Sequence, residues 1–195
     1  MLRLLILCAP ALLLAAPAWA HTEAGVPGGL LSGFLHPLSG FDHMIAMVSV
    51  GLWGALLGAP AIWVLPITFP LVMALGGVLG VLNVPVPQPE LMIALSAVVL
   101  GLVVAFRARV PLWVAGGIVA VFAIFHGYAH GQELPESSNP LAYGIGFVVA
   151  TGMLHALGIA IGVLTRWPTG MVAIRAMGVV VAGFGAVFLR TALAG

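Results

Sequence analysis

Residues 141–164 read LAYGIGFVVATGMLHALGIAIGVL, an apolar run that contains His155 and no Asp, Glu, Lys or Arg. The run is longer than the roughly 20 residues that an α-helix needs to cross the hydrocarbon core of a bilayer. Similar runs, separated by Pro, Gly and charged residues, precede and follow it. The sequence therefore predicts an all-α, polytopic membrane bundle of about six transmembrane helices, at residues 33–57, 61–82, 90–106, 112–130, 141–164 and 171–191.

The composition of the whole chain also indicates a bilayer environment. Of its 195 residues, 63% are hydrophobic and only 6% are charged, whereas a soluble domain carries roughly 25% charged residues. Lysine is absent, so the basic face that nucleic acid requires is missing. No phosphate-binding loop of the kind that holds a nucleotide is present. We expect a single transmembrane domain at residues 21–195, with neither nucleic acid nor nucleotide as a partner.

The first 20 residues have the pattern of a secretory signal peptide. Arg3 supplies the positive charge, residues 4–16 form an apolar core too short to span a bilayer, and residues 18–20 read Ala-Trp-Ala, a small-x-small cleavage site. We expect residues 1–20 to be removed, which would leave His21 as the first residue, outside the cytoplasm. The single cysteine of the chain would be lost with this segment, so neither a disulfide nor a thiolate metal site is expected.

The distribution of charge predicts how the bundle is oriented. If the N-terminus lies outside, the connections after the third and fifth helices lie in the cytoplasm. These connections and the start of the last helix hold Arg107, Arg109, Arg166 and Arg175. The connections on the opposite side hold Glu90, Glu133 and Glu136. Because basic residues concentrate on the cytoplasmic side, we expect a multi-pass protein of the bacterial inner membrane with both termini in the periplasm.

Glycines four residues apart recur within the predicted spans. The pairs are Gly54 and Gly58, Gly76 and Gly80, and Gly158 and Gly162. Small residues at this spacing let helix backbones approach closely inside a membrane, so they predict a compact bundle and no particular function.

Histidines recur in or at the edge of the predicted helices, where ionisable side chains are costly and usually functional. The first group is His36-Pro37-Leu38-Ser39-Gly40-Phe41-Asp42-His43. His36 and His43 are seven residues apart, which is two turns on one face of a continuous helix. Pro37 and Gly40 can loosen that helix. Asp42 is either an oxygen ligand or the partner that fixes the tautomer of the His43 ring.

The second group is His126-Gly127-Tyr128-Ala129-His130-Gly131-Gln132-Glu133, at the end of the fourth predicted helix. His126 and His130 are i, i+4 neighbours, and Glu133 lies three residues further along the same face. Two imidazoles and a carboxylate in this arrangement are typical of half a metal site. A third group, ending in Met153-Leu154-His155, places His155 near the middle of the fifth helix. A single intramembrane histidine more often bonds to a neighbouring helix, but several in so uncharged a chain favour a shared site.

Together, these groups resemble the motifs of the HupE/UreJ family, over essentially the whole chain after residue 20. The matching stretches are H-P-L-S-G-F-D-H, F-H-G-Y-A-H-G-Q-E and G-F-V-V-A-T-G-M-L-H, at residues 36–43, 125–133 and 146–155. That family is associated with uptake of nickel, sometimes cobalt, for the maturation of hydrogenase and urease. The resemblance implies that the metal function is carried by His36, Asp42, His43, His126, His130, Glu133 and His155.

We therefore predict a transporter, not an enzyme, that moves a divalent transition metal from the periplasm to the cytoplasm. The cation would arrive near His130 and Glu133, with His21 as a further candidate ligand, and would pass toward His155. Nickel or cobalt is the expected substrate, with no permanently bound cofactor, and an outer-membrane metal receptor or a metallochaperone is a candidate partner. The ligands also suit copper and zinc, so the resemblance favours nickel and the ligand chemistry does not.

Two alternatives to a transporter are left open by the sequence. The first is a membrane redox protein that binds haem, with His43 and His155 as axial ligands. The second is a subunit that anchors or assembles a metalloenzyme without moving metal itself.

Overall fold

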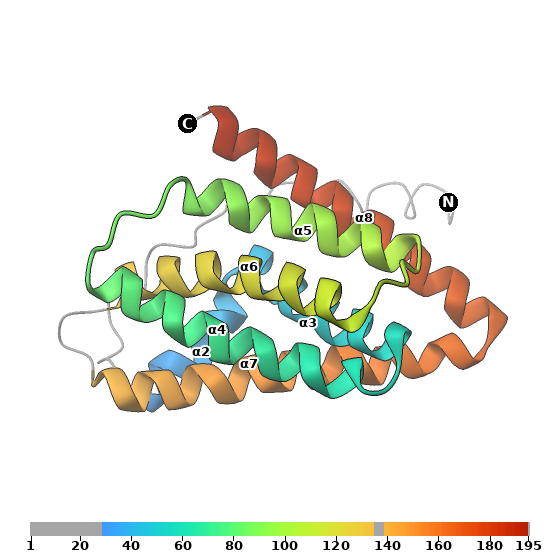
Figure 1. The fold of residues 1–195 in the computed structure, drawn as a ribbon, viewed down its shortest axis with the longest axis horizontal. Helices are drawn as coiled ribbons and strands as arrows, with labels where there is room; N and C mark the ends of the chain where they lie inside the picture. The colour runs from blue at the N-terminus through green and yellow to red at the C-terminus, as the bar shows by residue number, and fades with distance from the viewer. Residues whose placement is uncertain (1–28, 135–138, 195) are drawn as a thin grey trace, which may run out of the picture.

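The computed structural model describes residues 29–134 and 139–194, and its regular structure in these ranges is entirely helical (Figure 1). The predicted signal peptide, residues 1–20, and His21 lie outside the described residues. The elements are α2 (Leu30–Ser39), α3 (Phe41–Leu57), α4 (Ala61–Val81), α5 (Pro89–Ala105), α6 (Leu112–Gln132), α7 (Pro140–Gly162), the short 3-10 helix η1 (Val163–Arg166) and α8 (Pro168–Ala194).

Most of these helices have the length and composition of membrane spans. In the described ranges, α4, α6, α7 with η1, and α8 are each long and apolar enough to cross a bilayer. Helices α2 and α3 meet this criterion only when taken together as a bent pair. Helix α5 has 17 residues, the lower end of the spanning range. The fold is thus the all-α membrane bundle that the sequence predicts, with four clear spans, a fifth in the bent pair and a shorter apolar helix.

The prediction of one continuous helix over residues 33–57 is wrong. The structure divides it at Gly40 into α2 and α3, which are bent by 86° relative to each other. Pro37 removes a hydrogen bond from the last turn of α2, and Gly40 then takes an extended conformation with φ −86° and ψ 108°. His36 and His43 therefore lie on different helices, and the prediction that they share one helical face is also wrong.

Helices α4 and α6 pack against each other along a row of glycines. A Cβ atom on Gly76, Gly127 or Gly131 would collide with the main chain of the opposite helix. Such contacts allow the close backbone approach that stabilises helix pairs in lipid. Gly127 and Gly131 directly follow His126 and His130, so the packing of α6 on α4 also fixes the position of both histidines.

Glycine contacts also join α3 to α7 and α5 to α8. A Cβ on Gly51 of α3 would collide with the main chain at His155, and one on Gly101 of α5 would collide with α8. Arg175 of α8 adds a hydrogen bond from its Nε to the carbonyl oxygen of Ala105, 2.9 Å away at the end of α5. Helix α3 contacts α4, α5, α7 and α8, and it forms the centre of the bundle (Figure 1).

The two ends of the bundle differ in charge. Successive helices from α4 to α8 run in opposite directions (Figure 1). The connection that holds Arg107 and Arg109 therefore lies at the same end as Arg166, at the end of η1. Glu90 and Glu133 lie at the opposite end, which we call the glutamate end. Which end faces the cytoplasm is a prediction from the positive-inside rule.

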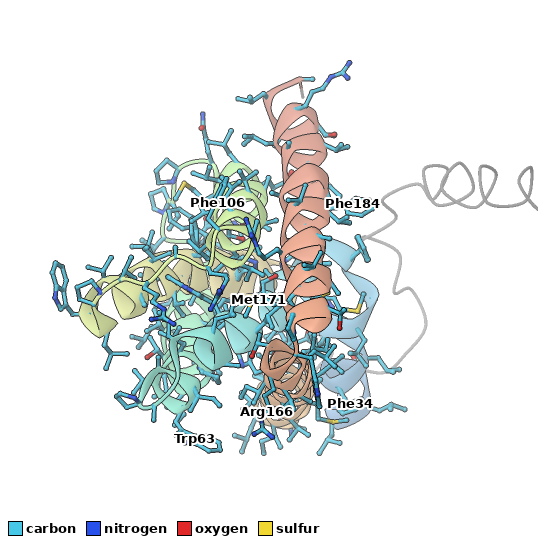
Figure 2. All side chains as sticks on the ribbon, turned by 90° about the vertical axis from the view of Figure 1, so that its right-hand side faces the viewer. Phe34, Trp63, Phe106, Arg166, Met171 and Phe184 are labelled. Carbon is cyan, nitrogen blue, oxygen red and sulfur yellow. The ribbon has the colours of Figure 1, made fainter. Side chains whose placement is uncertain are left out.

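The outer surface of the bundle is apolar. Trp63 lies at its edge in Figure 2, and Trp63 and Phe106 are 64% and 73% exposed. Exposed apolar patches of large extent are unusual on monomers that face water. The surface is suited to contact with lipid acyl chains, while Trp53 and Phe69 are fully buried inside the bundle.

Candidate metal site

Three side chains from two distant segments meet at the glutamate end, and we call them the outer cluster: His36, His130 and Glu133. One ligand atom from each lies within 4.8 Å of the other two. The Nε2 atom of His36 is 2.8 Å from Nδ1 of His130 and 3.3 Å from Oε2 of Glu133. The Nδ1 atom of His130 is 3.9 Å from the same carboxylate oxygen. Two imidazoles and a carboxylate at this separation can close around one divalent cation.

The helix geometry at the outer cluster favours a positive charge. His36 lies in the last turn of α2 and His130 in the last turn of α6, while Glu133 is the residue that caps α6. The C-terminal end of a helix carries a partial negative charge, so a cation is stabilised there. A broken helix whose end points at an ion is also the usual construction of binding sites in membrane transporters.

A second group of rings lies directly behind the outer cluster. The ring of His43, from the first turn of α3, lies with its centroid 4.5 Å from that of His130 and 4.9 Å from that of His126. The Nδ1–H group of His43 donates to Oδ1 of Asp42 at 2.9 Å. Asp42 thus orients the His43 ring, which is one of the two roles that the sequence left open.

His126 is held by its own helix and by an aromatic ring of α4. Its Nδ1–H group donates to the carbonyl oxygen of Phe122 at 2.9 Å. Phe69 contacts His126 and His155, with ring centroids 5.4 and 5.5 Å away. Neither ring nitrogen of His155 has a hydrogen-bond partner among the described residues. Among the described residues, the ring contact of His155 is with Phe69, and His155 is not a member of the outer cluster.

The exposure of these side chains differs between the two groups of residues and His155. Glu133 is 34% exposed, His36 16% and His130 8%, while His126 and His155 are buried. Asp42 and His43 are 31% and 13% exposed, so both groups have a partly exposed carboxylate and a more buried ring, whereas His126 and His155 lie deepest.

The structure brings most of the predicted site residues together but adds aromatic residues that the sequence did not indicate. Phe147 of α7 packs on His130 with a centroid distance of 4.5 Å, and Tyr143 lies 5.8 Å from the His36 ring. Phe69 is the third aromatic residue of this kind. No pattern in the sequence distinguishes these rings from ordinary core residues, because their role depends on which helices pack together.

We expect Asp42→Asn to lower metal affinity by roughly 10- to 100-fold, because a carboxylate that is hydrogen-bonded to a ligand histidine fixes the tautomer and the basicity of its ring. The change keeps the shape of the side chain and removes its charge. Titration of the purified protein with nickel measures the effect, and Gln132→Ala, an exposed change near the same site, is the control. Equal affinities of the wild type and Asp42→Asn would contradict an orienting role for Asp42.

Apolar helices that bring imidazole and carboxylate groups together define a multi-pass membrane protein with a candidate cation site. The chain belongs to the HupE/UreJ family. The model of this family, described as "HupE / UreJ protein", matches residues 9–188. It is similar to Protein HupE of Rhizobium leguminosarum bv. viciae, with 46% identity over 177 residues that cover 90% of this chain and 93% of that protein. None of the solved structures matches the chain. The family is one of transporters, not enzymes, and is associated with nickel or cobalt uptake for hydrogenase or urease.

Proposed function

We propose that this protein carries a divalent metal ion from the periplasm to the cytoplasm. The proposed substrate is nickel, with cobalt as a second substrate. The metal would serve a hydrogenase or a urease. The observation that carries the proposal is the outer cluster, in which His36, His130 and Glu133 come within 4.8 Å of one another. An ionisable group inside a membrane is costly, so three that converge from two distant segments support a role in binding.

The chemistry of the ligands supports a transition metal over a harder ion. Imidazole nitrogen suits nickel, cobalt, copper and zinc, whereas sites for magnesium and calcium are built from oxygen. The one carboxylate of the outer cluster partly neutralises the charge of the incoming cation. Copper binds such ligands more tightly than nickel, so selectivity has to come from coordination geometry and metal supply.

The order of the groups supports a direction of movement. Under the positive-inside rule the glutamate end faces the periplasm, so a cation would first meet Glu133 and His36. It would continue to His43 and His126 and then pass Phe69 to reach His155.

A haem site receives no support from the geometry of the described residues. Axial ligation needs two imidazoles that face each other across a wide planar macrocycle. The ring of His43 instead packs against two other histidines at centroid distances of 4.5 and 4.9 Å. The ring of Phe69 contacts both His155 and His126.

Uptake of radiolabelled nickel into proteoliposomes that contain only this chain tests the proposal. We expect uptake by the wild type and by Gln132→Ala, competition by cobalt, and a loss of most uptake in His36→Ala, which removes one ligand of the outer cluster. Parallel assays with excess zinc and copper measure selectivity. Absence of uptake by the wild type would overturn transport and would favour a subunit that assembles a metalloenzyme without moving metal.

A further inference from the structure

Three neighbouring histidine rings each carry a buried nitrogen that has no hydrogen-bond partner among the described residues. These nitrogens are the Nε2 atoms of His43, His126 and His130, which we call the inner cluster. His43 comes from α3, and His126 and His130 are i, i+4 neighbours on one face of α6. Buried polar atoms in folded proteins nearly always have a partner, so several orphans in one place indicate a ligand that binds there.

The hydrogen bonds on the other side of two of these rings fix which nitrogen can bind a metal. A carbonyl oxygen only accepts, so Nδ1 of His126 must carry the proton that it donates to Phe122. The carboxylate of Asp42 likewise accepts from Nδ1 of His43. In the neutral rings of both histidines, Nε2 therefore holds the lone pair. This is the usual arrangement of metal-binding histidines, whose second nitrogen donates to a carbonyl or carboxylate.

His130 belongs to both clusters through its two nitrogens. Its Nδ1 atom faces His36 and Glu133 in the outer cluster, while its Nε2 atom is the unpartnered nitrogen of the inner cluster. A neutral imidazole has one lone pair and one N–H group. The ring can therefore serve as a ligand in only one cluster at a time.

We propose that His43, His126 and His130 form a second metal site through their Nε2 atoms, and that the outer and inner sites share His130 and are occupied alternately. The inference rests on the proposed function and deepens it, since it divides the route into two binding steps. When the ion moves inward, Nε2 of His130 gives its proton to water and Nδ1 takes one proton from water, so the ring changes tautomer, no net proton is released and the charge of the ring is unchanged. The Nδ1–H group can then donate to His36.

The inner site has to contract when it binds. Among the described residues, only the outer cluster has its ligand atoms all within 4.8 Å of one another, and bonds of about 2.0–2.1 Å bring the nitrogens around one ion closer than that. Rotations of the His43 and His126 rings would supply the difference. The ligand set has three nitrogens and no oxygen, and it selects a transition metal of the nickel, cobalt, copper and zinc group.

Binding of Co²⁺ to the purified full-length protein tests the two-site arrangement, because its visible absorption depends on the ligands. We expect the wild type to bind one Co²⁺ per chain. The double variant His36→Ala/Glu133→Ala, which lacks the outer site, should still bind one Co²⁺, with an altered spectrum. His126→Ala and His43→Ala, which damage the inner site from different helices, should each leave binding at the outer site with a second, different spectrum.

Several outcomes would overturn the inference. Two Co²⁺ ions per wild-type chain would refute the shared ring, and loss of all binding in the folded double variant would refute the inner site. The inner site would also be refuted if His126→Ala and His43→Ala had the same spectra and affinities as the wild type. Nickel uptake by proteoliposomes separates this test from that of the proposed function. Two spectroscopic sites without uptake would refute transport alone, and uptake without an inner-site spectrum would refute the second site alone.

Discussion

His130→Ala is expected to abolish nickel uptake and to lower the affinity of the purified protein for nickel. The loss of affinity should exceed the roughly 10- to 100-fold that follows when a residue hydrogen-bonded to a ligand is lost. The reason is that His130 is the ring that touches both groups of histidines. It lies 2.8 Å from His36 on one side, and its centroid is 4.5 Å from that of His43 on the other. Its removal takes one ligand from each cluster, whereas loss of His36 or His126 affects only one.

The measurement combines nickel titration with uptake by proteoliposomes, and Gln132→Ala on the same turn is the matched control. Gln132 is exposed, so its truncation should leave both quantities near the wild-type values. A His130→Ala protein that is folded and retains more than half of the wild-type uptake would show that the metal follows another route. The nickel affinity and uptake of His36→Ala should lie between those of His130→Ala and Gln132→Ala, because His36→Ala leaves the inner cluster intact.

Gly127→Ala is expected to destabilise the folded protein by about 1–3 kcal/mol, the usual cost of overpacking a tight core. The added Cβ would collide with the carbonyl group of Met73 on α4 and would come within 2.9 Å of the main-chain nitrogen of Gly77. These are backbone atoms, which cannot rotate away as the end of a side chain can. Helices α4 and α6 would have to separate, and His126 and His130 would move with α6.

Gly117→Ala is the control for this effect, because it makes the same change on the same helix. Nothing lies within 4 Å of a Cβ at Gly117. Replacement of Gly by Ala in a helix with free space stabilises by at most about 1 kcal/mol, so the two variants should shift the melting temperature in detergent in opposite directions. Equal melting temperatures would contradict the tight α4–α6 contact. We also expect Gly127→Ala to lose metal affinity, and Gly117→Ala to keep it.

Membership of the class of helical membrane proteins could be predicted from the sequence alone. Runs such as 141–164 are long and apolar, and length and polarity are local properties that need no knowledge of neighbours. The residues of the outer and inner clusters were also identifiable, because ionisable groups are rare in such runs. The i, i+4 spacing of His126 and His130 places both on one helix face without further information.

The course of the first span could not be predicted in the same way. Pro37 and Gly40 indicated a loosened helix, but only the packing of α2 and α3 against α7 determines the bend of 86°. The bend separates His36 from His43 and turns the first toward His130, 94 residues away in the sequence. Phe69 and Phe147 likewise became part of the site only through the helices that bring them there.

The sequence by itself determined that this chain lies in a membrane, which histidines and carboxylates are candidates for binding a cation, and which family motifs they form. The tertiary structure decided that His36, His130 and Glu133 meet, while His155 contacts Phe69 and is not part of that group. The physical reason is that burial in lipid depends on the composition of each segment, whereas a ligand set depends on distances between segments. Those distances are set by close contacts of backbone with backbone, such as the contact at Gly127.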